Sequence, residues 1–375
     1  MDGEAMKFSA NKEVLCNSLH AVSGGVGVGQ SMAILANVLL RVADGVLELA
    51  TTNIDFAMGC TAQCAVSADG SATLPAKKLA TLCRAIESST IDFELLPAGN
   101  LVRISGGGSL FRMASLPAAD FPSLPDVQWA GGAKLSADGL GKCIGLVDYA
   151  QSRDEHRPVL NGIFFQFSDD SLSLVATDGR RLAKCTTACV GGDYFFVLPA
   201  RSCAELSKLL CGGEELCACF ANGQASFAIA YGGGGVRRSW LVSKVMEGKY
   251  PDYGQVIPSA PEHRLLLQRE AFLSALQRGA IMGSGSAAAV RMKFSENLVE
   301  ISASSGEFGD SYERVAAISP GQKPVEISFN PRYLMEPLRA IGEAEVAFEL
   351  RNSLGAGVIR TSDNFLCVVM PLRTG

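Results

Sequence analysis

The sequence predicts an α+β fold made of three repeated domains, each with helices packed on antiparallel sheets. Three features predict it: a proline-containing segment that opens a helix, a hairpin with a polar turn, and a helix before that hairpin. Each recurs three times with a period of about 125 residues, in one order, which indicates a triplicated unit. The chain has 375 residues, of which 48% are hydrophobic and 19% charged, enough for two or three domains with large cores.

The helix-opening segment reads LPAKKL at residues 74–79, LPARSC at 198–203 and FNPRYL at 329–334. Each copy follows a strand-like run. Proline suits the first turn of a helix because its missing N–H would have no partner there. A helix is therefore predicted after each segment. In the third copy Pro337 lies inside the expected helix and should kink or shorten it.

The recurring hairpin reads NVLLRVADGVLELATT at residues 37–52, GIFFQFSDDSLSLVAT at 162–177 and AVRMKFSENLVEISAS at 289–304. Apolar residues alternate on both sides of a polar turn, which is typical of antiparallel strands with one buried face. The turns are expected at Asp44-Gly45, near Asp169-Asp170 and near Glu296-Asn297.

A helix is expected before each hairpin. In the second copy Leu140, Ile144 and Val147 recur at helical spacing and share one side. Each repeat should therefore run helix, hairpin, helix and further strands. The three preceding helices are expected at Asn11–Val22, Asp138–Ala150 and Arg269–Met282.

Stretches rich in proline and glycine mark the joints between repeats, at Phe121–Gly132 and Pro251–Pro261. Such stretches are typical of connections between domains. We therefore expect three domains, at residues 1–128, 129–259 and 260–375.

Composition excludes several classes of protein. The net charge of -5 argues against a chain that grips nucleic acid with its whole surface. No run of about 18 apolar residues occurs, and Met1–Phe8 lacks the apolar core of a signal peptide, so we expect a cytoplasmic protein. The twelve cysteines include no CxxC pair, and His20, His156 and His263 are scattered. We therefore expect small buried thiols in a reducing compartment and no metal site.

Each second helix carries two basic residues seven positions apart, about two helical turns, so both charges share one face. At about 100° per residue, the apolar residues fall on the opposite side. Repeated basic faces in an acidic chain point to a surface that follows phosphates without reading bases. The basic pairs are Lys77 and Arg84, Arg201 and Lys208, and Arg332 and Arg339. The expected buried residues are Leu79, Leu82, Cys83, Ile86, Cys203, Leu206, Leu210, Leu334, Leu338 and Ile341.

Two motifs suggest chemistry. Gly24–Ser31 resembles a phosphate-binding loop, but it lacks GK[ST] and follows a helix, so we interpret it as a connection. Thr177–Leu182 contains Asp178, a candidate catalytic carboxylate without a second acid or a nucleophile–base pair nearby in sequence. A turn whose arginines pin a neighbouring loop is the simpler interpretation. A nucleotide-dependent enzyme using this cluster, and a scaffold that binds only proteins through solvated basic faces, remain alternatives.

Four further segments are SLPAADFPSLP at 115–125, ATDGRRLA at 176–183, SKVMEGKYPDY at 243–253 and VVMPLR at 368–373. They resemble the bacterial DNA sliding clamp family, the β subunit of the replicative polymerase. The resemblance covers about residues 6–373, and the segments keep the family's order. It implies a ring-shaped homodimer in which each chain forms half of a closed ring of six like domains, with helices inside and sheets outside.

The resemblance implies a processivity factor without catalytic activity or cofactor. Its implied partners are duplex DNA, bound without sequence preference, and the catalytic subunit of the replicative polymerase. The clamp loader, and other polymerases and repair proteins with clamp-binding peptides, would share the same site. No membrane partner is implied.

Three sets of site residues follow from the resemblance. A peptide groove between the second and third domains would be formed by Leu160, Thr177, Gly179, Arg181, Leu182, Pro251, Val256, Asn330, Tyr333, Val368, Val369, Met370, Pro371, Leu372 and Arg373. The family's DNA contacts match Lys77, Arg157, Arg201 and Lys244, beside the helical cations Arg84, Lys208, Arg332 and Arg339. The dimer interface would join Phe111 and Met113 of one subunit to Ile281 and Met282 of the other.

Within the groove, apolar depth is expected from Leu182, Val256, Val369 and Met370. Arg181 and Asn330 would orient polar groups of the peptide. Alternatively, Val368–Met370 is a final core strand. Three positions depart from common family residues: Gln255 stands for arginine, Ala356 for serine, and Gly29-Gln30 for a loop arginine. The first two put the peptide preference in question, and the third a DNA contact.

Overall fold

The computed structural model describes residues 6–27, 32–97, 101–127, 131–168, 170–232, 236–282, 289–307, 309–319, 323–361 and 364–372. The chain divides into two compact units. Unit 1 comprises residues 1–141, 168–170 and 189–245, and unit 2 comprises residues 142–167, 171–188 and 246–375. Each unit therefore contains one terminal repeat and part of the central repeat.

Two α-helices per repeat are present in the described residues, at the predicted places. They are α1 (Lys12–Ala21), α2 (Ala76–Ala85), α3 (Ala137–Val147), α4 (Ala200–Leu210), α5 (Arg269–Ile281) and α6 (Pro331–Ala340). Asn330 caps α6, because its side-chain oxygen accepts the N–H of Arg332.

Pro337 does not shorten α6, so the expected shortening is wrong, whereas the expected kink stays a prediction. The helix has 10 residues, as α2 has. Proline has no N–H, so the hydrogen bond that its nitrogen would donate is lost. The last turn still closes, because the N–H of Ile341 donates to the carbonyl of Pro337.

The three hairpins form as predicted. They are β2 (Asn37–Ala43) with β3 (Val46–Thr52), β11 (Gly162–Ser168) with β12 (Ser171–Thr177), and β19 (Val290–Ser295) with β20 (Leu298–Ser305). In the first turn Asp44 and Gly45 have φ angles of 51° and 78°. Positive φ at both positions suits the twist of a two-residue hairpin. Asp169 of the second turn lies outside the described residues.

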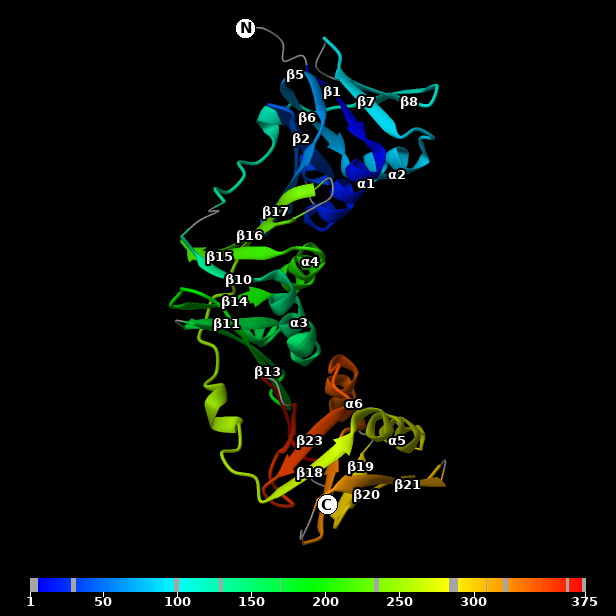
Figure 1. Ribbon diagram of the computed structural model, residues 1–375, viewed down its shortest axis with the longest axis vertical. Coiled ribbons are helices and arrows are strands. Elements are labelled where there is room, and N and C mark those ends of the chain that lie inside the picture. Colours follow the sequence, from blue (N-terminus) through cyan, green and yellow to red (C-terminus); the bar gives the residue numbers. More distant parts are fainter. Residues whose placement is uncertain are drawn as a thin grey trace. The chain divides into compact units, whose positions relative to one another are not determined.

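The described strands of unit 1, apart from β14, form two antiparallel sheets. The smaller sheet has the order β5-β1-β7-β8-β9, with β1 (Lys7–Asn11), β5 (Ala65–Ala68), β7 (Thr90–Leu95), β8 (Leu101–Gly106) and β9 (Ser109–Ala114). The larger has the order β10-β15-β16-β17-β4-β3-β2-β6, with β4 (Phe56–Gln63), β6 (Gly70–Pro75), β10 (Ala133–Ser136), β15 (Glu215–Ala221), β16 (Gln224–Ala230) and β17 (Val236–Lys244). β14 (Tyr194–Pro199) leads into α4 in the same unit, and α1 packs beside α2 (Figure 1).

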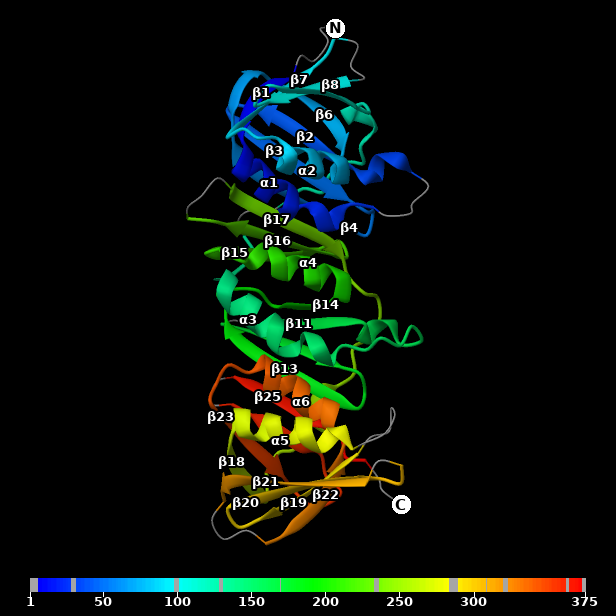
Figure 2. The same ribbon diagram turned by 90° about the vertical axis from the view of Figure 1, so that its right-hand side faces the viewer.

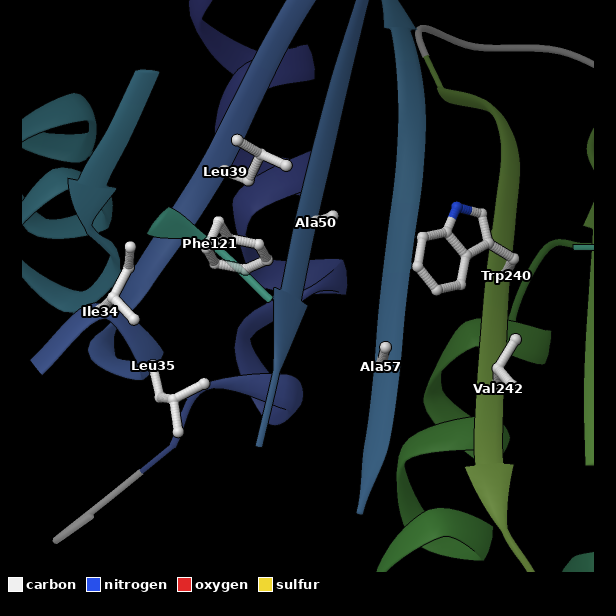
Figure 3. Packing of buried hydrophobic residues seen from close by; sticks show 8 residues of the cluster. All are labelled: Ile34, Leu35, Leu39, Ala50, Ala57, Phe121, Trp240 and Val242. Atoms are coloured by element: carbon white, nitrogen blue, oxygen red, sulfur yellow. The ribbon is translucent and has the colours of Figure 1, made fainter. Parts of the chain in front are cut away.

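The larger sheet of unit 1 crosses from the first repeat to the central one. β17, the last strand of the central repeat, pairs antiparallel with β4 of the first repeat. A small core covers this region (Figure 3). Phe121, from the chain after β9, packs with Ile34 and Leu39, and Trp240 of β17 lies in the same cluster as Ala57 of β4. The predicted joint at Phe121–Gly132 therefore begins with a buried anchor.

Unit 2 repeats this kind of joint. Its strands follow the order β11-β12-β13-β25-β24-β23-β18-β21-β20-β19-β22. β25, the last strand of the third repeat, pairs antiparallel with β13 of the central repeat. Helices α5 and α6 lie side by side (Figure 2). Besides the two hairpins, the strands of unit 2 are β13 (Arg181–Ala188), β18 (His263–Gln268), β21 (Gly309–Ile318), β22 (Val325–Phe329), β23 (Glu345–Leu350), β24 (Gly357–Arg360) and β25 (Phe365–Val369).

All twelve cysteines are free thiols, and eight of them are buried. Burial raises the pKa of the Cys60 and Cys367 thiols to about 12, so both stay protonated at neutral pH. The prediction of buried thiols is confirmed for these eight, whereas Cys211 is exposed. Among the described residues, no three His, Cys, Asp or Glu side chains gather as a metal site. The helices formed by the described residues are too short or too polar to span a membrane.

Candidate functional sites: basic helix faces, strand edges and a C-terminal surface

The predicted two-sided helices are confirmed. All six helical cations are exposed. Of the ten apolar residues expected on the opposite sides, all but the half-buried Leu82 are buried. Each of α2, α4 and α6 thus attaches to its unit through one side and presents two cations on the other, and we call these surfaces the basic faces.

Some cations of the basic faces have acidic neighbours on the same helix. Lys208 Nζ lies 2.8 Å from Glu205 Oε1, and Arg332 Nε lies 2.9 Å from Glu336 Oε1. Both cationic side chains stay more than 60% exposed, so these ion pairs are solvent-screened and weak. Arg157 is also exposed, in the loop that follows α3 in unit 2.

Arg201 and Lys244 hold positions in unit 1 beside the first repeat. The Arg201 guanidinium donates to the carbonyl of Gly24 at 3.4 Å and lies over the Phe56 ring at 5.4 Å. Lys244 Nζ lies 3.7 Å from Asp55 Oδ1. Gly24 starts the glycine-rich connection. Residues 28–31 of this connection, including Gly29 and Gln30, lie outside the described part of the chain.

β9 and β21, which carry or adjoin the predicted interface residues, each have one edge unpaired over most of their length in the described residues. β9 ends its sheet and pairs only with β8, and it carries Phe111, which is 40% exposed, and the half-buried Met113. β21 pairs with β20 from Gly309 to Ala316 and meets β18 only at its last two residues. Ile281 ends α5, which packs against β21, and is 70% exposed. Met282 follows it and is half-buried.

The C-terminal surface is the name we give to residues 177–182, 251–256 and 368–372 of unit 2, with Leu160, Asn330 and Tyr333. Val368 and Val369 are buried, so their interpretation as a final core strand is confirmed. Leu160 and Leu182 are buried as well. Arg373 lies outside the described residues. Of the four residues expected to supply apolar depth, only Val256 and Met370 are exposed, at 48% and 46%.

Arg181 is enclosed at the centre of the C-terminal surface, with a side chain only 6% exposed. It pairs with Asp178 at 3.1 Å and with Glu336 of α6, and it donates to the carbonyl of Tyr149. Its guanidinium lies over the Tyr333 ring at 4.7 Å and the Tyr149 ring at 5.4 Å. Arg181 therefore ties β13 to α6 and positions Tyr333, rather than standing open to a ligand.

The end of the chain is held by its backbone. The N–H of Met370 donates to the carbonyl of Arg180 at 2.9 Å, and the N–H of Leu372 donates to Ser328 at 2.8 Å. A hydrogen bond to the Tyr333 side chain raises the pKa of Arg180. Met370 is thus fixed next to the residue that also contacts Tyr333.

The segment before the third repeat is anchored on the sheet of unit 2. Tyr250 stacks on Phe164 with ring centroids 4.7 Å apart, and the Tyr253 hydroxyl donates to Gln166 Oε1 at 2.7 Å. These contacts leave Pro251 and Val256 exposed on the outside. Gln255 Nε2 donates to Asp252 Oδ2 at 3.0 Å.

Asp178 has a structural role in its turn. Its Oδ1 accepts the N–H groups of Arg180 and Arg181, and its Oδ2 pairs with Arg181. Thr177 Oγ1 donates to the Arg181 carbonyl at 2.6 Å and accepts the N–H of Gly179. Both carboxylate oxygens are therefore engaged in closing the turn, as the simpler interpretation predicted.

Leu354 is a residue that sequence reasoning missed. It is 82% exposed in the turn between β23 and β24. Gly357, which ends this turn, pairs with Val369, so the turn adjoins the C-terminal surface. A Cβ at Gly357 would lie 2.8 Å from the rings of Phe329 and Phe348, so close packing requires glycine there. A lone leucine in the polar stretch RNSLGAG was the available signal.

Comparison with known proteins identifies the family. Three family models match in succession: the N-terminal, central and C-terminal domains of the DNA polymerase III beta subunit, at residues 6–125, 134–252 and 254–373. The beta sliding clamps of Salmonella typhimurium and Escherichia coli K12 are each 30% identical to this chain, over 98% of it and 100% of the relative.

Solved structures agree with the sequence relatives. A sliding clamp from Pseudomonas aeruginosa bound to griselimycin matches with a TM-score of 0.90 and 27% identity, over 99% of this chain and 100% of that one. The clamp from Bacillus subtilis shares the fold with a TM-score of 0.90 at 23% identity, over the same shares. The chain therefore belongs to the DNA polymerase III beta subunit family of sliding clamps, the processivity factors of DNA polymerase, with three clamp-type domains.

Proposed function

We propose that two copies of this chain join head to tail into a closed ring that encircles duplex DNA, slides along it and tethers partner proteins. The partners are the polymerase catalytic subunit, the clamp loader, and other polymerases and repair proteins that carry clamp-binding peptides. The protein acts in the cytoplasm, uses no cofactor and catalyses no reaction. Its domains are residues 1–128, 129–259 and 260–375.

The main support for the ring is that the same strand pairing joins successive repeats twice. In unit 1, β17 pairs with β4, and in unit 2, β25 pairs with β13. In both, the last strand of one repeat pairs with the strand that follows the hairpin of the preceding repeat. By the same rule, β9 of the first repeat and β21 of the third are the strands left without such a partner among the described residues.

Pairing β9 of one copy with β21 of another would add the missing joints and close the assembly. Such a contact is heterologous, which means that it joins two different surfaces of the two copies. It gives a closed ring when the rotation that relates successive copies returns to the first copy. Phe111 and Met113 on β9, with Ile281 and Met282 beside β21, would supply its apolar contacts.

A closed ring predicts retention that depends on DNA topology. Protein loaded onto circular duplex DNA by a clamp loader should stay bound at moderate salt, and cutting the circle once should release it, because a ring slides off a free end. Gel filtration of the loaded DNA before and after cutting measures this. Equal retention on both forms would contradict the ring and favour ordinary surface binding.

The basic faces support contact with the DNA backbone. Their cations belong to helices rather than to loops, recur in each repeat and lie in a chain of net charge -5. Exposed lysine and arginine side chains bind phosphates without distinguishing bases. Arg157 and Lys244 would add contacts from outside these helices.

We expect the six helical cations to determine how strongly DNA binding depends on salt. Replacing Lys77, Arg84, Arg201, Lys208, Arg332 and Arg339 with glutamine should leave folding and dimerisation intact, since all six are exposed. Affinity for a short duplex should fall, and the salt slope should decrease by about 0.9 per lost phosphate contact. Fluorescence anisotropy across a salt series measures the slope. Arg291 and Lys293 on β19 are matched controls, and an unchanged slope in the six-fold variant would refute the assignment.

The C-terminal surface supports the tethering role. Val256, Met370 and Leu354 expose apolar side chains. The buried Arg181 lies over the Tyr333 ring, and the N–H of Met370 donates to the carbonyl of Arg180. An exposed methionine suits a site that accepts several different peptides, because its side chain is flexible and polarisable. The whole set lies in one compact unit, so its shape does not depend on the position of the other unit.

A further inference from the structure

Glu336 is shared between the two proposed binding surfaces. Its Oε2 accepts Arg181, which is enclosed in the C-terminal surface. Its Oε1 accepts Arg332 Nε at 2.9 Å, and Arg332 belongs to the basic face of α6. The two arginines differ in exposure: the Arg181 side chain is 6% exposed and that of Arg332 is 63% exposed.

The outer ion pair is the one that a ligand can open. Arg332 is solvent-screened, and a DNA phosphate offers its guanidinium a stronger, bidentate partner than Glu336 does. Arg181 has no comparable freedom, because Asp178, the Tyr149 carbonyl and two aromatic rings also hold it. When Arg332 turns to a phosphate, the full charge of Glu336 remains for Arg181.

We propose that Glu336 couples the two surfaces, so that phosphate binding at Arg332 tightens the hold of Glu336 on Arg181 and strengthens peptide binding. The effect passes through Arg181 to Tyr333, which it stacks on, so Glu336 is a positioning residue for the peptide. Coupling between sites is reciprocal, so a bound peptide should also favour DNA at Arg332. This inference rests on the proposed function of both surfaces.

The test replaces Arg332 and measures peptide binding in the absence of DNA. Arg332→Gln should raise the affinity of the dimer for a synthetic peptide carrying the clamp-binding segment of the organism's polymerase catalytic subunit. An increase of about two- to fivefold is expected, at the low end of allosteric coupling because the outer pair is exposed. Arg291→Gln is the matched control: it removes an arginine of similar exposure that pairs with Glu326 in the same unit. It should leave the peptide affinity unchanged.

A double-mutant cycle separates coupling from a general structural effect. In a Glu336→Gln background, Arg332→Gln should no longer alter peptide affinity. Saturating duplex DNA should raise the peptide affinity of the wild type and leave that of Arg332→Gln unchanged. If Glu336→Gln does not fold, the Arg332→Gln and Arg291→Gln comparison and the DNA experiment still decide.

Equal peptide affinities of wild type, Arg332→Gln and Arg291→Gln would overturn the coupling, as would the same response to Arg332→Gln in both backgrounds. Failure of the wild type to bind the peptide at all would instead overturn the proposed tethering function. The two failures are therefore distinguishable in one set of titrations.

Discussion

Replacing Ile281 and Met282 with alanine is expected to convert the dimer into folded monomers. Ile281 is 70% exposed at the end of α5, so its loss removes little from the core of unit 2. In a closed ring the same side chains would be buried against β9 of the other copy. Central apolar anchors of an interface typically contribute about 2 kcal/mol or more each, so two losses weaken association by roughly a thousandfold.

Light scattering at low micromolar concentration measures this result. The wild type should give twice the chain mass of 39.4 kDa, and the double variant should give a single chain mass. Val190→Ala, which truncates an apolar residue 68% exposed in unit 1 and outside the proposed sites, should remain dimeric. A double variant that still scatters as a dimer would place the interface elsewhere.

Deleting Met370–Gly375 is expected to abolish peptide binding while the dimer and its hold on circular DNA survive. The deletion removes the exposed Met370 and the backbone bond that fixes Leu372 to Ser328. β25 ends at Val369, so its pairing with β13 and β24 stays in place. Met370→Ala alone should weaken peptide binding by about 1–3 kcal/mol, the range for a buried anchor.

Calorimetric titration with a polymerase-derived peptide checks both variants. Removing only Thr374 and Gly375 is the matched control, since Met370–Leu372 then remain and affinity should be unchanged. Circular dichroism should show the same secondary structure in all three proteins. Wild-type affinity in the longer truncation would show that the peptide binds away from the C-terminal surface.

Local features of this protein could be read from the sequence because they depend on neighbouring residues. The helices and hairpins follow from apolar spacing and turn residues within each repeat, and three copies reinforced the same pattern. The two-sided character of α2, α4 and α6 is also local, since residues seven apart share a helix face whatever surrounds the helix.

Contacts between distant segments required the tertiary structure. Arg181 looked like a side chain free to orient a ligand, but Glu336 and Tyr333, about 155 residues later, enclose it. Val369 is a core residue because it pairs with Arg181 of β13 and Gly357 of β24, whereas Met370 lies beyond the end of β25 and is exposed. The repeats, their elements and the basic faces follow from local sequence patterns. Strand partners and the burial of single side chains depend on pairing between segments far apart in the chain, which no local pattern encodes.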